Sequence, residues 1–178
     1  HGLWFAGALA VGVIGVGGWQ AWSASQLSAS RAHAEDYAAA QELARAGNMD
    51  EAKIAFERLT GEGPHTYRVM AQMEHAAVLE VQGDLEGALA GFDQAAEQAN
   101  DPIMRQTAQL RAAYIAAETQ DLAALQTRLQ PLIDSEGRLS YLARELLAIE
   151  AWEAGDLDLA RETLENLTLA FDAPEAVR

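Results

Sequence analysis

The chain has 178 residues, of which 12 are Lys or Arg and 27 are Asp or Glu, giving a formal net charge of −15. A surface this acidic repels nucleic-acid phosphates and anionic lipid headgroups, so neither is expected as a partner. The absence of Cys excludes disulfide bonds, thiolate metal ligands and cysteine nucleophiles.

The first predicted element is a membrane helix within residues 1–22. The run from Gly2 to Trp22 contains no charged residue, and a helix of this length spans ~31 Å, close to the thickness of the bilayer core. Trp4 lies near one end and Trp19 and Trp22 near the other, where their rings are expected to anchor the two interfaces. A cleaved signal peptide is the alternative, although its apolar core is normally shorter.

Small residues form a stripe on this predicted membrane helix. Ala8, Gly12 and Gly15 follow i, i+4, i+7 spacing, which places them on one helical face. Such residues let two helices in lipid approach closely. The stripe predicts a contact with another membrane helix, and the alternative is that Gly is simply common in membrane helices.

Residues 23–34 are predicted to be a juxtamembrane stalk. They contain neither Gly nor Pro and include several Ala residues, which favour helix, whereas four serines weaken it. The membrane helix either continues through this stalk into the next helix or frays at the serines.

A turn-and-helix motif then recurs four times, with starting residues 36, 37 and 35 positions apart. In three copies a Gly stands where it can end one helix, and in all four an Asn or Asp stands where it can cap the next. The third copy begins with Gln120 and has Leu125 in place of the final Ala. The four copies are GNMDEA (47–52), GDLEGA (83–88), QDLAAL (120–125) and GDLDLA (155–160).

Two further positions keep a constant distance from this motif. A small residue stands seven positions before each copy, and a large apolar residue stands four positions after it. Small residues allow close helix crossings, and large ones fill the remaining space, so both sets are predicted to form the repeat core. The small residues are Ala40, Ala76, Ala113 and Ala148, and the large ones are Phe56, Phe92, Leu129 and Leu164.

The predicted fold is therefore all-α, a single N-terminal transmembrane helix followed by a solenoid of about four antiparallel helix pairs in residues 35–178. Breaks at residues 61–64, 100–102 and 135–137 separate the pairs. The expected helix pairs are 35–46 with 49–60, 65–82 with 85–99, 102–119 with 122–134, and 138–154 with 157–171.

No catalytic, cofactor or metal site is expected. His65 and His75 are ten positions apart, too far to share one helical turn, and no glycine-rich phosphate loop joins a strand to a helix. Asp156 and Asp158 lack the Gly and Glu that a calcium loop requires, and helix capping explains them better.

The G-D-x-x-x-A motif followed by an aromatic residue or Leu resembles the tetratricopeptide repeat. With the N-terminal anchor, the chain is similar to the bacterial membrane-anchored tetratricopeptide-like family that includes the ancillary subunit of the Sec translocon. This resemblance implies a non-catalytic interaction module at the bacterial inner membrane, single-pass, with a periplasmic repeat domain. The implied partners are a translocon and exported client polypeptides. The alternatives are an accessory structural subunit of another inner-membrane complex, such as a respiratory one, and an enzyme using the acidic surface.

Overall fold

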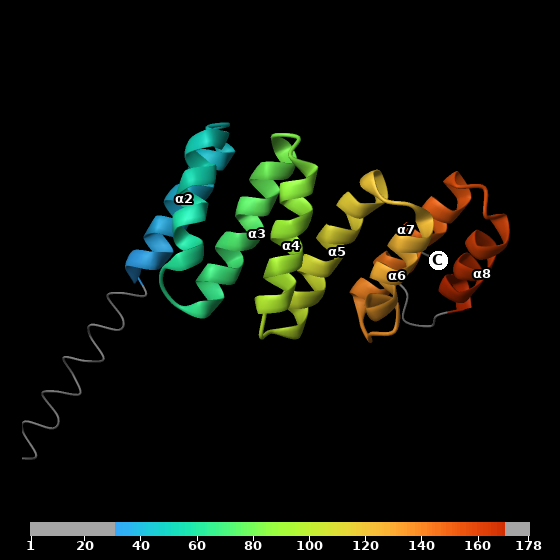
Figure 1. The fold of residues 1–178 in the computed structure, drawn as a ribbon. Coiled ribbons are helices and arrows are strands. Elements are labelled where there is room, and N and C mark those ends of the chain that lie inside the picture. Colours follow the sequence, from blue (N-terminus) through green and yellow to red (C-terminus); the bar gives the residue numbers. More distant parts are fainter. Residues whose placement is uncertain (1–30, 170–178) are drawn as a thin grey trace, which may run out of the picture.

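A computed structural model describes residues 31–169, in which the regular secondary structure is entirely α-helical. The helices form antiparallel pairs that stand side by side in one row (Figure 1). The described part of the chain thus confirms the predicted all-α fold of stacked helix pairs. After a first helical stretch at residues 31–45, the helices are α2 (Met49–Gly61), α3 (His65–Val81), α4 (Leu85–Gln98), α5 (Pro102–Thr119), α6 (Leu122–Ile133), α7 (Arg138–Glu153) and α8 (Leu157–Leu169).

The expected membrane helix, with Trp4, Trp19, Trp22 and the stripe Ala8, Gly12 and Gly15, lies outside the described residues. Among residues 31–169, no helix has both the length and the apolar character needed to cross a bilayer. The first helical stretch includes residues 31–34, so this part of the predicted stalk is helical.

The repeated turns use the glycines and aspartates of the motif. Gly47, Gly83 and Gly155 have φ near +82°, a left-handed conformation that only Gly adopts without strain. Asn48 makes no side-chain capping bond, unlike the aspartates that begin later helices. The capping carboxylates are Asp84, Asp101, Asp121 and Asp156, which accept hydrogen bonds from the backbone N–H of Gly87, Met104, Ala124 and Leu159.

Seven of the eight predicted repeat-core residues are buried, each at most 2% exposed. Leu164 is the exception, because 43% of its surface is exposed. Its counterparts Phe56, Phe92 and Leu129 share clusters with residues of the first helix of the following pair. Leu164 lies on α8, the last described helix. Among the described elements, α8 packs extensively on α7 alone. The expectation that Leu164 belongs to the core is therefore wrong.

A close crossing joins α3 to α4 at Ala76 and Gly91. A Cβ atom added to Gly91 would lie 2.8 Å from the Cβ of Ala76, closer than two carbon atoms can approach without displacement. Both residues are buried. Small side chains are therefore required on both helices at this point.

A candidate polypeptide-binding pocket on the first helices

The first helices of three successive pairs enclose an apolar pocket of about 360 Å³. Three of the chain's four methionines line it, with Tyr37 and Ile103 completing its apolar wall. Met side chains are unbranched and flexible, so a surface built from them adapts to ligands of different shape. The lining residues are Tyr37, Met70, Met73, Glu74, Asp101, Ile103, Met104 and Thr107.

A small hydrogen-bond network fixes one end of this first-helix pocket. The Tyr37 hydroxyl donates to Oε1 of Glu74 at 3.0 Å, and Nε2 of Gln41 donates to the same oxygen at 3.1 Å. Burial and the neighbouring Glu74 carboxylate raise the pKa of Tyr37 well above its usual value. The phenol therefore stays protonated and keeps donating to Glu74 across the physiological pH range.

Further exposed apolar side chains lie on the first helices but do not line the pocket. They are Val81 of α3, Tyr114 of α5 and Ile149 of α7. Partial burial, together with the negative charge of Glu145 on α7, raises the pKa of the Tyr114 phenol.

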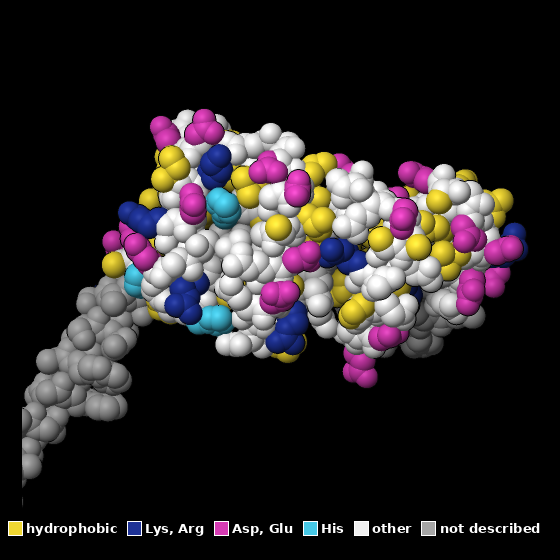
Figure 2. Space-filling view, viewed as in Figure 1, with side chains coloured by type: hydrophobic (Ala, Val, Ile, Leu, Met, Phe, Trp, Pro, Cys, Tyr) yellow, Lys and Arg dark blue, Asp and Glu magenta, His cyan; other side chains and the backbone are white. Residues whose placement is uncertain are grey.

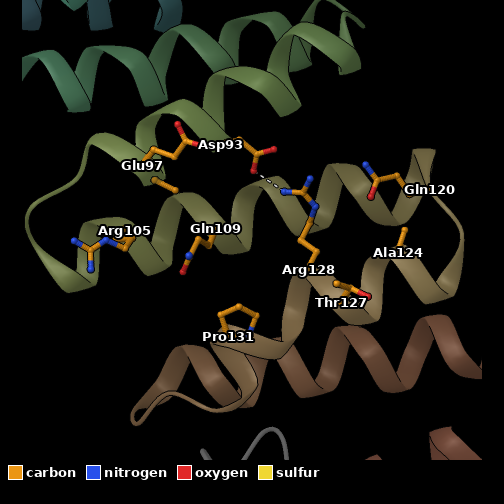
Figure 3. Close-up of a pocket in the computed structure, with 10 residues that line it drawn as sticks. Asp93, Glu97, Arg105, Gln109, Gln120, Ala124, Thr127, Arg128 and Pro131 are labelled. Carbon is orange, nitrogen blue, oxygen red and sulfur yellow. Dashed lines mark hydrogen bonds and ion pairs between the residues drawn. The ribbon is translucent and has the colours of Figure 1, made fainter.

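A second, polar groove lies between α4 and α6 over α5 and has a volume of about 710 Å³ (Figure 3). Arg128 of α6 and Asp93 of α4 form an ion pair across it at 2.5 Å. The Nε atom of Arg128 is buried and has no hydrogen-bond partner. The groove is lined by Asp93, Ala96, Glu97, Arg105, Gln109, Gln120, Ala124, Thr127, Arg128 and Pro131.

The irregular third copy of the motif contributes Gln120 and Ala124 to the lining of this polar groove. Leu125 is buried at the position where the other copies have Ala52, Ala88 and Ala160. In the described structure α6 packs less extensively on α5 than α4 does on α3. The lining combines carboxylates, guanidinium groups and amides with apolar surface of similar area, so the groove offers both hydrogen bonds and apolar contact.

Of the two histidines weighed as metal ligands, His65 is hydrogen-bonded to a backbone carbonyl and His75 is partly buried. Nε2 of His65 donates to the backbone carbonyl of Gln98 at 2.8 Å, which ties α3 to the end of α4. Burial lowers the pKa of His75, so its ring favours the neutral form. Within residues 31–169, no group of three or more His, Asp or Glu side chains is placed to hold a metal ion.

The sequence interpretation did not identify the first-helix pocket. None of the residues predicted for the repeat core lines it, and the three methionines carry no repeat signal, since they occupy different positions relative to the motif. The clustering of Met on two neighbouring first helices is the signal that could have revealed it.

Comparisons with known proteins agree with this architecture. A family model described as a tetratricopeptide repeat-like domain matches residues 1–136. The ancillary SecYEG translocon subunit of Escherichia coli (strain K12) is 32% identical over 164 residues, which cover 83% of this chain and 78% of that protein. No solved structure shows a significant match. The chain belongs to the tetratricopeptide repeat-like family.

Proposed function

We propose that the protein is a non-catalytic, membrane-anchored interaction module that acts as an ancillary subunit of a protein translocon. One helix in residues 1–22 holds it in the bacterial inner membrane, and the helical array extends into the periplasm. There the first-helix pocket binds segments of exported polypeptides. The similarity to the ancillary SecYEG translocon subunit supports the partner.

The observation that carries this proposal is the composition of the first-helix pocket. Met70, Met73 and Met104 surround a cavity that also exposes Ile103, on a chain whose overall surface is strongly acidic. Exported polypeptides differ in sequence, and a flexible, polarizable lining can repack around different apolar side chains. A pocket for one invariant ligand would need more fixed polar groups than the few that line this one, which are Tyr37, Glu74, Asp101 and Thr107.

The pocket is tested by replacing Ile103 with Asp in the full-length membrane protein. Ile103 is 71% exposed, so the charge should not disturb folding, but it places a carboxylate at the pocket. We expect at least a tenfold loss of copurified client polypeptides, measured by quantitative mass spectrometry after detergent extraction.

Ile54→Asp provides the matched control, because Ile54 is 65% exposed and lies on the second helix of its pair. It should retain the clients recovered with the unmodified protein. Equal losses in the two variants, or no loss in either, would contradict the assignment of the pocket.

The membrane helix is proposed to contact the same complex through Ala8, Gly12 and Gly15. Replacing Gly12 and Gly15 together with Leu puts bulky side chains on this face and prevents a second helix from approaching closely. Copurification of the translocon should therefore fall, while the protein stays in the membrane fraction. Val13 and Gly17 lie on the opposite side of an ideal helix, and their replacement with Leu provides the control. Full retention of the translocon by the Gly12/Gly15 variant would show that the helix is only a tether.

A further inference from the structure

The C-terminal end of the described array carries an apolar groove that is separate from the first-helix pocket. This end groove has a volume of about 370 Å³ and is lined by Trp152 of α7 together with Leu157, Ala160, Arg161, Leu164 and Glu165 of α8. Trp152 is 67% exposed and Leu157 is 57% exposed. Figure 2 shows hydrophobic side chains gathered over α7 and α8, whereas acidic side chains are spread across the visible face.

The earlier repeats show what normally covers this groove. Leu164 corresponds to Phe56, Phe92 and Leu129, which are buried, and Leu157 corresponds to Met49, Leu85 and Leu122, which pack against the same core clusters. In each case the following first helix supplies part of the cover. The end groove therefore has the form of the interface between repeats with one helix missing from the described residues.

The internal interfaces also define the side chains that such a helix must supply. Each cluster includes an alanine and a larger aliphatic residue from the following first helix, spaced three or seven positions apart. Three and seven residues separate positions on one helical face. These pairs are Ala71 with Val78 on α3, Ala112 with Ile115 on α5, and Ala143 with Leu146 on α7.

We propose that the end groove binds one amphipathic helix of a partner protein, which takes the position of the first helix of a fifth repeat. This inference rests on the proposed function as an interaction module and names a second contact of that module. The partner helix carries a small residue and an aliphatic residue on its apolar face, with basic residues beside them.

Charge around the end groove selects this occupant. The helices that line the groove also carry the exposed residues Glu153, Asp158 and Glu162, and the Arg161 guanidinium is paired with Asp158 at 3.5 Å. Lys or Arg beside the apolar face of a bound helix would complement these groups. If a second copy of α8 bound there instead, the acidic side chains Asp158 and Glu162 of the two copies would repel each other. This repulsion disfavours self-association.

The chain itself provides a probe for the test. A peptide with the sequence of α5 (Pro102–Thr119) contains the Ala112–Ile115 pair, two arginines and one carboxylate. Stapled on its solvent-facing side and labelled with a fluorophore, it is titrated with the full-length protein in detergent, and binding is followed by fluorescence anisotropy. We expect saturable binding that weakens at least tenfold in the Leu164→Glu variant.

Ile54→Glu is the matched control, since it adds the same charge at an exposed apolar position of another second helix, and it should leave peptide affinity unchanged. Absence of binding, or equal binding to the Leu164→Glu variant, would overturn the proposal. If the protein forms a dimer that the Leu164→Glu substitution dissociates, the groove binds a second copy of the chain. If deletion of residues 170–178 raises the affinity for the peptide tenfold, the groove binds the chain's own C-terminal residues. Either outcome overturns the partner assignment, whereas loss of clients in Ile103→Asp would still support the first-helix pocket.

Discussion

Replacing Phe92 with Ala is expected to lower the free energy of unfolding by ~3–5 kcal/mol. Phe92 is 1% exposed and packs with Ala76 of α3 and with Ala112 and Ile115 of α5, so its ring connects two helix pairs. The Arg111 guanidinium also lies 5.0 Å from the ring centroid. Truncation removes these contacts and leaves a cavity at the interface between repeats.

The loss is measured by urea denaturation of the repeat array, followed by circular dichroism. Because the repeats stabilise one another through their interfaces, a defect near the middle should lower the stability of neighbouring pairs as well. Ile54→Ala, at an exposed position, should change the free energy of unfolding by no more than about 0.5 kcal/mol. If the two variants have the same midpoint, Phe92 does not hold the interface together.

Replacing Ala76 with Leu is expected to cost ~1–3 kcal/mol through overpacking. Ala76 faces Gly91 at a crossing that does not accommodate even one additional methyl group without displacement. The larger side chain must force α3 away from α4 or adopt a strained rotamer. Thermal unfolding should therefore show a lower midpoint.

Ala90→Leu tests whether the effect is specific to the crossing. Ala90 is exposed on α4, one position before Gly91, so a larger side chain there extends into solvent. It should leave the midpoint nearly unchanged. A lower midpoint for Ala90→Leu together with an unchanged one for Ala76→Leu would mean that the close contact is elsewhere.

The helices and most of the core could be predicted because both depend on local, repeated chemistry. Gly83 and Asp84 end one helix and cap the next by interactions within a few residues, and Ala76 and Phe92 keep a fixed distance from that turn. Leu164 has the same local pattern as Phe92, yet its burial depends on another helix packing over it. Repeat position therefore predicts which side of a helix a residue faces, and the neighbouring helix decides whether that side is covered.

The binding surfaces were less predictable because they arise from the relative placement of several helices. Met70 and Met104 belong to different repeats and occupy unrelated positions in them, but the packing of α3 and α5 on α4 brings both to one pocket. The polar groove likewise combines residues that are distant in sequence, since Asp93 of α4 and Arg128 of α6 meet across it. Asn48 likewise occupies a capping position without making the expected bond.

The most direct test of the account is site-specific photocrosslinking in intact membranes. A photoreactive phenylalanine analogue is introduced at position 103, in the first-helix pocket, and separately at position 54, where exposure is similar but which does not line that pocket. During active export, position 103 is predicted to crosslink to client polypeptides of several sizes and position 54 to give little product. Crosslinking of clients with equal yield from both positions, or from position 54 alone, would contradict the central claim that the first helices bind them.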